Sequence, residues 1–251
     1  MLLLVVGAVV VCAAAVLGGI TGFGFALVCT PLLLLAGFPL AEVVVVNLTI
    51  GLITRLVVAV RFRDAVDRSR ATALVLGCVP GLALGALTRT AVDGPVLEVT
   101  AGAVAVLVAG YLLLRPPAPR LRAGGAPRSR LPAGGAGLLG GFLGITTSLN
   151  GPPPVILLSR QQAVPRQFVA DLAVYFVACN ALALLLIGLS GDLAADRVGR
   201  LLAWWLPGAL IGNALGTALG GRVPAALFGR LTLGLVLVTG ATTVIRAVTG
   251  G

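Results

Sequence analysis

The feature that most constrains this chain is a succession of long apolar segments separated by short loops that carry most of its charge. A helix rises 1.5 Å per residue, so about 20 apolar residues are needed to cross the roughly 30 Å hydrocarbon core of a membrane. Only 10% of the residues are charged, whereas about a quarter are charged in an average soluble domain. The sequence therefore predicts an all-α, polytopic membrane protein. The uninterrupted apolar segments cover residues 40–60, 71–87, 96–114, 168–189, 200–219 and 225–248.

Two further apolar stretches, 1–36 and 133–159, are interrupted by glycine and proline. The first contains LGGITGFGFALVCTP from Leu17, and the second contains LGGFLGITTSLNGPP from Leu139. Aligned at an offset of 122, the two share three glycines and the final proline, and Gly22 falls on Gly144. Each stretch predicts either two short helices or a re-entrant hairpin, and both alternatives return the chain to the side from which it entered.

Arginine provides all 18 basic residues, and its distribution predicts the orientation of the chain. Loop 61–70 has four arginines and loop 115–130 has five, and the two intervening spans place these loops on one side. Thirteen arginines fall on that side and four on the other, while Arg55 lies inside a span. Cytoplasmic loops carry an excess of basic residues, so we expect an inner-membrane protein with linker 115–130 in the cytoplasm and both termini outside. Because the arginines act as topology signals, we expect no nucleic-acid partner.

A second match indicates an internal repeat. The sequence VPGLALGAL, at 79–87, pairs with LPGALIGNAL, at 206–215, at an offset of 127. Each half has a broken pair followed by three spans, and the halves begin on opposite sides of the membrane. We therefore predict two inverted-topology repeats, an arrangement found in many secondary transporters. The predicted parts are repeat one at 1–114, an Arg/Pro/Gly-rich linker at 115–131 and repeat two at 132–251.

Breaks at membrane depth in both halves predict a binding site where the halves meet. In lipid, free backbone N–H and C=O groups are costly unless they are buried in protein or line a wet cavity. The N-terminus of a half-helix offers unpaired N–H groups and a partial positive charge, which suit an anion. The alternative is that the glycines only let helices cross closely and that the asparagines form interhelical hydrogen bonds. The predicted substrate-binding residues are Gly22, Gly24, Asn47, Thr147, Ser148, Asn150, Gly151 and Asn180.

Three charged residues within the spans need a reason, because a charge at mid-bilayer costs at least about 2.5–3.5 kcal/mol. Arg55 shares a helix face with Asn47 and either snorkels to the cytoplasmic surface or attracts an anion. Glu42 and Asp171 lie near the ends of their spans, where a helix cap or an arginine partner would explain them. Burial disfavours the charged form of a carboxyl group, so both are also candidates for proton coupling.

At these motifs the chain resembles the sulfite exporter TauE/SafE family, within the toluene sulfonate uptake permease superfamily. The resemblance is carried by LGGITGFGFALVCTPLL, LGITTSLNGPPPVILL and the paired PGLALG and PGALIG, and it covers nearly the whole chain in the expected order. It implies a secondary transporter of a sulfur-containing anion such as sulfite, a sulfonate or thiosulfate.

Other classes of function are disfavoured by what the sequence lacks. It has no histidine and no Walker-type G-x-x-x-x-G-K-[ST] motif, and its four cysteines stand singly in apolar segments. We therefore expect no enzyme activity, no cofactor and no metal. The predicted function is a permease for a small anion such as sulfite or an organosulfonate, with the proton as the candidate coupling ion. A passive anion channel and a non-transporting assembly subunit are the alternatives, and the sequence allows a homo-oligomer.

Overall fold

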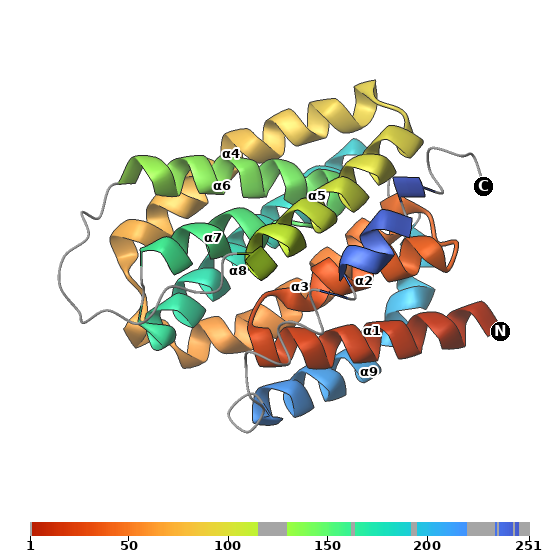
Figure 1. The fold of residues 1–251 in the computed structure, drawn as a ribbon, viewed down its shortest axis with the longest axis horizontal. Coiled ribbons are helices and arrows are strands. Elements are labelled where there is room, and N and C mark those ends of the chain that lie inside the picture. The colour runs from red at the N-terminus through yellow and green to blue at the C-terminus, as the bar shows by residue number, and fades with distance from the viewer. Residues whose placement is uncertain are drawn as a thin grey trace.

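The computed structural model describes residues 2–114, 130–161, 164–191, 195–219, 234, 236–242 and 244–245. Over these residues the chain is helical and contains no strand (Figure 1). The first half contains α1 (Leu2–Thr21), α2 (Gly24–Leu35), α3 (Leu40–Arg61), the short 3-10 helix η1 (Arg63–Ala65), α4 (Arg68–Ala91) and α5 (Gly94–Leu114). The second half contains α6 (Arg130–Thr147), α7 (Pro152–Arg160), α8 (Pro165–Ser190) and α9 (Ala195–Leu219).

The predicted membrane spans are confirmed where the structure describes them. Among the described residues, six helices are long and apolar enough to cross a membrane: α1, α3, α4, α5, α8 and α9. Five of them correspond to predicted spans, whereas α1 belongs to stretch 1–36, for which two short helices or a re-entrant hairpin were predicted, and is itself 20 residues long. The predicted span 225–248 lies largely outside the described residues, although those described between 234 and 245 are helical. The predicted linker also lies outside them up to residue 129.

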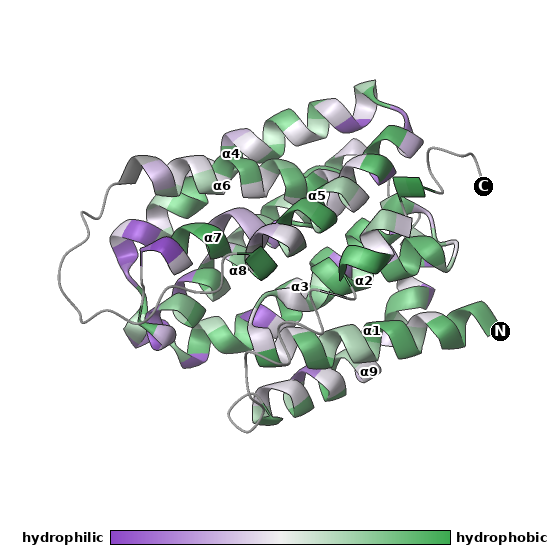
Figure 2. Ribbon diagram, in the orientation of Figure 1, coloured by the Kyte–Doolittle hydropathy of each residue, from purple (hydrophilic) through white to green (hydrophobic). Residues whose placement is uncertain are grey.

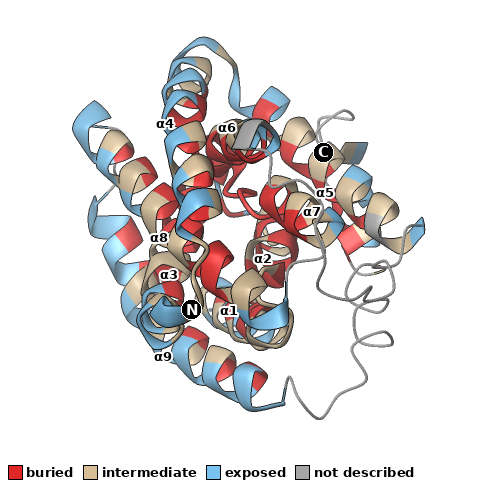
Figure 3. Cartoon of the chain, turned by 90° about the vertical axis from the view of Figure 1, so that its left-hand side faces the viewer, coloured by how far each residue is buried: buried red, intermediate tan, exposed pale blue. Residues whose placement is uncertain are grey.

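The surface of the bundle is suited to lipid. Figure 2 shows apolar residues along most of the helix surfaces, with hydrophilic residues gathered towards the end where α3 passes into α4. Large apolar side chains are exposed along α1, α4 and α9, including Val9, Leu84 and Ile211. Buried residues line the interior, around α2, α7 and the inner faces of α3 and α8 (Figure 3). Apolar side chains on the outside are stable only in an apolar solvent, so these faces fit a bilayer.

The longest helix contacts run between the two halves, and they occur twice. Helix α4 packs along α6, and α9 packs along α1. A Cβ added at Gly81 of α4 would lie 2.0 Å from the carbonyl oxygen of Leu138 on α6. A Cβ at Gly216 of α9 would lie 2.1 Å from that of Val16 on α1. The predicted role of these glycine ladders in close helix packing therefore fits the structure.

Both predicted breaks are present, but the second lies one helical turn later than the alignment indicates. Helix α1 ends at Thr21 and is followed by Gly22, whose φ is +85°. Helix α6 ends at Thr147 and is followed by Ser148, whose φ is 61°. The two residues with positive φ, Gly22 and Ser148, are therefore 126 positions apart, while Gly144 lies inside α6. At the offset of 126 only Gly18 falls on a glycine, Gly144, so counting glycine matches favoured the offset of 122.

Candidate functional site

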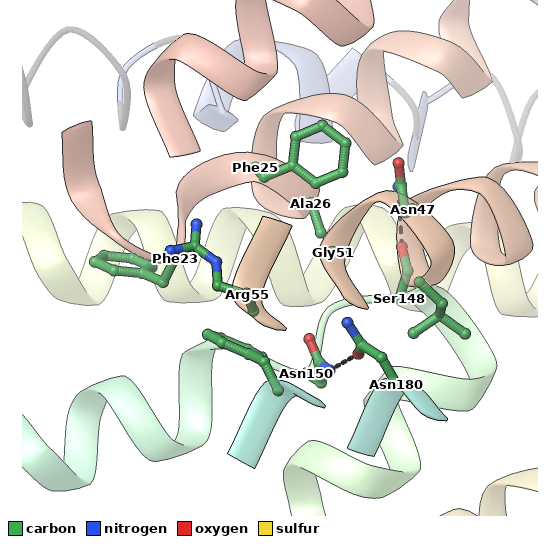
Figure 4. A pocket seen from close by; sticks show the side chains of 11 residues that line it. Phe23, Phe25, Ala26, Asn47, Gly51, Arg55, Ser148, Asn150 and Asn180 are labelled. Atoms are coloured by element: carbon green, nitrogen blue, oxygen red, sulfur yellow. Dashed lines mark hydrogen bonds between the residues drawn. The ribbon is translucent and has the colours of Figure 1, made fainter. Parts of the chain in front are cut away.

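A pocket with an empty volume of about 340 Å³, its open mouth included, lies between the two breaks (Figure 4). Its wall combines one arginine, four uncharged polar side chains and several apolar ones, contributed by both halves of the chain. The lining residues are Phe23, Phe25, Ala26, Asn47, Leu48, Gly51, Arg55, Ser148, Asn150, Phe176 and Asn180.

A cluster of three buried polar side chains joins the breaks. Nδ2 of Asn47 on α3 donates to Oγ1 of Thr30 on α2, at 3.0 Å, and to Oγ of Ser148, at 3.1 Å. The two hydroxyl oxygens lie 2.9 Å apart. Both amide hydrogens of Asn47 are thereby used, and one hydroxyl donates to the other. One hydroxyl hydrogen is left over, and when Thr30 is the internal donor it belongs to Ser148, which lines the pocket.

A second polar contact joins the break after α6 to α8. Nδ2 of Asn150 donates to Oδ1 of Asn180 at 2.6 Å, which leaves the Asn180 amide nitrogen for other partners. Gly51 on α3 makes room for this nitrogen, because a Cβ there would lie 2.7 Å from it. A glycine is therefore needed at the contact between α3 and α8 for the Asn180 amide to keep its position at the pocket wall.

Arg55 supplies a positive charge to the pocket wall. Arg55 is only 8% exposed, and its Nη2 donates to the carbonyl oxygen of Gly18 at 3.0 Å. That carbonyl also accepts from the backbone N–H of Gly22 at 2.8 Å, so Arg55 adds a second hydrogen bond near the end of α1. No carboxylate forms an ion pair with Arg55 among the residues that the structure describes. Arg55 thus donates a hydrogen bond to the end of α1, and its positive charge has no carboxylate partner among the described residues beside the pocket.

The first break is stabilised locally by its own side chains. Oγ1 of Thr21 accepts from the backbone N–H of Gly24 at 2.9 Å, which satisfies a free donor at the start of α2. A Cβ at Gly24 would lie 2.8 Å from that hydroxyl oxygen. Gly24, one of the predicted substrate-binding residues, therefore packs against the cap of α2 and does not line the pocket.

Three other predicted residues also lie outside the pocket wall. Gly22 has nothing within 4 Å of its would-be Cβ, and the Thr147 hydroxyl donates back to the Leu143 carbonyl oxygen at 2.8 Å. Gly151 lies between the breaks, because its would-be Cβ falls 3.4 Å from Cζ of Phe176 and 3.6 Å from the carbonyl oxygen of Phe23. The structure thus brings Asn47, Ser148, Asn150, Asn180 and Arg55 together and gives the glycines roles in backbone shape and packing.

Glu42 and Asp171, the candidates for proton coupling, lie away from the pocket wall and have arginine partners. Oε1 of Glu42 lies 2.9 Å from Nε of Arg197. Oδ2 of Asp171 accepts from Nε of Arg70 at 2.7 Å. An arginine partner was one of the explanations offered by the sequence for these carboxylates, and the structure favours it over a helix cap at Asp171, which lies beyond the first turn of α8.

The sequence did not predict the phenylalanines that line the pocket or the hydroxyl group of Thr30 beside it. Phe23, Phe25 and Phe176 read in the sequence as ordinary membrane residues, and Thr30 is one hydroxyl in an apolar run. The only local signal was that Phe23 and Phe25 flank the break itself. Their pocket position depends on how α2 folds back on α1, where a Cβ at Gly18 would lie 2.7 Å from the Phe25 Cβ.

Comparison with known families gives one match over nearly the whole chain. The model of the family described as sulfite exporter TauE/SafE matches residues 6–243. Neither the curated proteins nor the solved structures include a match to the chain. The matched range includes both breaks, every residue that lines the pocket and both glycine ladders. The chain therefore belongs to the sulfite exporter TauE/SafE family, whose members are membrane transporters of sulfur-containing anions.

Proposed function

We propose that this protein is a secondary transporter that carries a small sulfur-containing anion, such as sulfite or an organosulfonate, across the cytoplasmic membrane. The observation that carries the proposal is the buried Arg55 charge at the pocket wall, which has no carboxylate partner among the described residues. A buried charge without a partner is costly, and an anion in the pocket would compensate it. Ser148 and Asn180 add donors within the same wall.

The packing of the helices supports the predicted inverted repeat. An exchange of the halves turns α1, α3 and α4 into α6, α8 and α9. The contact of α4 with α6 then becomes the contact of α9 with α1, and both occur. The exchange also turns α3 into α8 and α8 into α3, so the contact between these two helices is unchanged. A pseudo-two-fold axis through the α3–α8 contact, beside the pocket, accounts for all three pairs, and transporters with inverted repeats bind their substrates at such an interface.

The orientation stays a prediction based on the arginines. We place η1 and the linker in the cytoplasm, and both termini and the α8–α9 turn outside. Single cysteines introduced into these loops and labelled in intact cells would test this orientation. A linker labelled from outside would contradict it.

Purified protein in liposomes tests the transport proposal. Sulfite, thiosulfate, ethanesulfonate and acetate would be offered with and without a pH gradient. We expect a sulfur anion to accumulate against its gradient. Flux without accumulation would indicate the channel, and absence of flux would favour the assembly subunit. If Glu42 or Asp171 carries the coupling proton, Glu42→Gln or Asp171→Asn should abolish pH-driven accumulation and leave exchange.

Arg55 variants test the site directly. A lost hydrogen bond to a charged group is worth about 1.5–3 kcal/mol, so Arg55→Gln should weaken anion binding about 10- to 100-fold. Glutamine can still donate to the Gly18 carbonyl, so the broken end of α1 keeps a partner. Arg55→Lys, which retains the charge, is the matched control and should bind more tightly than Arg55→Gln. Equal binding by wild type and Arg55→Gln would remove Arg55 from the site.

A further inference from the structure

Two ion pairs tie the pocket helices to their neighbours. On α3, Oε1 of Glu42 lies 2.9 Å from Nε of Arg197 on α9. On α8, Oδ2 of Asp171 lies 2.7 Å from Nε and 2.5 Å from Nη2 of Arg70 on α4. In both pairs the carboxylate belongs to a helix that lines the pocket, and the arginine belongs to a helix that packs along one of the broken pairs.

The two pairs lie on opposite sides of the pocket. Gly51 of α3 faces Asn180 of α8 in the pocket wall. η1, which follows α3, contacts α8, and the Asp67 backbone N–H donates to Asp171, so α3 and α8 run antiparallel. Glu42 precedes Gly51 by nine residues, and Asp171 precedes Asn180 by nine. Each carboxylate is therefore roughly 13 to 14 Å along its helix from the pocket, in opposite directions.

The two arginines occupy equivalent positions in the two halves. Arg70 is the third residue of α4, and Arg197 is the third residue of α9. Their offset of 127 equals that between Pro80 and Pro207 in the same helices. The exchange of halves that relates α4 to α9 also relates α8 to α3, so one pair is the counterpart of the other across the repeat.

The two pairs differ in how completely they are formed. The Arg70 and Asp171 side chains are 10% and 0% exposed, and Oδ1 of Asp171 accepts from the Asp67 N–H at 2.8 Å. The Arg197 side chain is 54% exposed, and Oε2 of Glu42 is buried with no hydrogen-bond partner among the described residues. Nη2 of Arg70 also has no hydrogen-bond partner among the described residues, but it lies in ion-pair contact with Asp171. A buried pair resists separation by this contact, whereas an exposed pair contributes little. The Arg70–Asp171 pair is therefore the stronger of the two.

We infer that these pairs are the two latches of an alternating-access cycle. The Arg70–Asp171 pair, the inner latch, holds α4 and its partner α6 against α8 and closes the cytoplasmic path to the pocket. The Glu42–Arg197 pair, the outer latch, holds α9 and its partner α1 against α3 and closes the path from outside. Each latch must separate for the pocket to open on its own side. The inference rests on the proposed transport function and orientation, and it assigns both carboxylates a role without proton transfer.

Access to the pocket from each side provides the test. Ala26, which lines the pocket, would be changed to cysteine in a chain whose native cysteines are replaced by alanine. Membrane-impermeant methanethiosulfonate would then be applied to inside-out and right-side-out vesicles. Arg70→Gln and Asp171→Asn should each raise the labelling rate from the cytoplasmic side about tenfold without raising it from outside. Arg197→Gln and Glu42→Gln should raise the outside rate alone, by about twofold to fivefold, because the outer latch is weaker.

Several outcomes would overturn the inference. An equal rise of the labelling rate from both sides would indicate a general loosening of the bundle. No change in either rate would show that the pairs do not control access to the pocket. If Asp171→Asn and Glu42→Gln change the labelling rates but Arg70→Gln and Arg197→Gln do not, the carboxylates act as proton carriers and not as latches. Reversal of the outer charges, by Glu42→Arg with Arg197→Glu, should restore the wild-type rate from outside. Two variants for each latch, both compared after gel filtration in detergent, keep the test valid if one fails to fold.

The labelling experiment also separates this inference from the proposed function. It uses no transported anion, so side-specific changes in a protein that carries no sulfur anion would contradict only the transport proposal. Anion transport by wild type, with labelling rates that no latch variant changes, would contradict only the latches.

Discussion

The two helix breaks differ in chemistry, although each follows the first helix of its half of the chain. The first is built on Gly22, and the side chains that it gives to the pocket, Phe23 and Phe25, are apolar. The second is built on Ser148, and it gives the pocket polar side chains from Ser148 and Asn150. The first break thus gives the pocket hydrocarbon side chains, and the second gives it hydrogen-bond donors.

The Arg55 charge completes this asymmetry. It comes from α3, in the half with the apolar break, and it donates to α1 of the same half. The asparagine and hydroxyl groups that meet the pocket from the other half carry no charge. A single cation between an aromatic wall and neutral donors is an environment for one anionic group attached to a small apolar body.

The largest expected difference between the halves concerns the glycine ladders. A Cβ at Gly81 would lie 2.0 Å from a backbone oxygen, whereas at its counterpart Gly208 the nearest heavy atom is 3.7 Å away. Gly81→Ala should therefore destabilise the protein by about 1–3 kcal/mol through overpacking. Gly208→Ala should be neutral or stabilising by up to about 1 kcal/mol, because alanine favours helix. Unfolding in detergent would measure both, and equal losses would contradict this difference in packing.

Exchange of the break residues should give the next largest effect. Ser148→Gly relieves a left-handed conformation that costs about 1–2 kcal/mol, and it loses hydrogen bonds of similar total value. Stability should change little, while anion affinity should fall about tenfold with the lost hydroxyl. Gly22→Ser has open space and should cost only the strain, about 1–2 kcal/mol, with unchanged affinity. Calorimetric titration would measure the affinities, and a larger loss for Gly22→Ser would reverse the assigned roles.

The predicted architecture followed from strong and simple signals. Apolar segments long enough to cross a membrane predicted the ends of α3 to within one residue and those of α8 to within three, because lipid permits few other structures. The position of the second break was harder to predict from the sequence. Gly144 and Ser148 are both reasonable turn residues, but Gly144 lies inside α6, where its would-be Cβ falls 3.1 Å from the Asn150 Cβ, and the left-handed residue is Ser148.

The polar residues that line the pocket were among the predicted site residues, whereas its apolar residues were not. Asn47, Asn150 and Asn180 stand out because a buried amide in a span needs a partner. The partners themselves were not predictable. That Asn150 bonds Asn180, and that Asn47 bridges Thr30 and Ser148, depends on contacts between segments more than 15 residues apart in the chain.

The Asn150–Asn180 hydrogen bond predicts a moderate effect. Asn150 donates to Asn180 and so positions it, and its removal should weaken anion binding about fivefold to tenfold. Because the two amides act as a unit, Asn180→Ala should lose little more when Asn150→Ala is already present. Thr147→Val is the matched control, since the Thr147 hydroxyl bonds only within α6. Additive losses in a double-mutant cycle would show that the asparagines act separately.

The smallest expected effect lies at the contact where the two halves meet. A Cβ at Gly51 would lie 2.7 Å from the Asn180 amide nitrogen, the mobile end of a side chain that can shift by a few tenths of an ångström. Gly51→Ala should therefore weaken anion binding only about twofold to threefold. Stability should be unchanged or rise by up to about 1 kcal/mol, because alanine is the better helix former.

Gly110→Ala on α5 provides the control for that measurement, because nothing lies within 4 Å of its would-be Cβ and it does not line the pocket. It should give the same gain in helix stability without a change in affinity. In a chain that already carries Asn180→Ala, Gly51→Ala should no longer weaken anion binding, because the Asn180 amide that the added methyl group would displace is absent. If Gly51→Ala instead weakens binding equally with and without Asn180, the added methyl group acts on the anion itself, and the pocket extends closer to α3 than the Asn180 contact indicates.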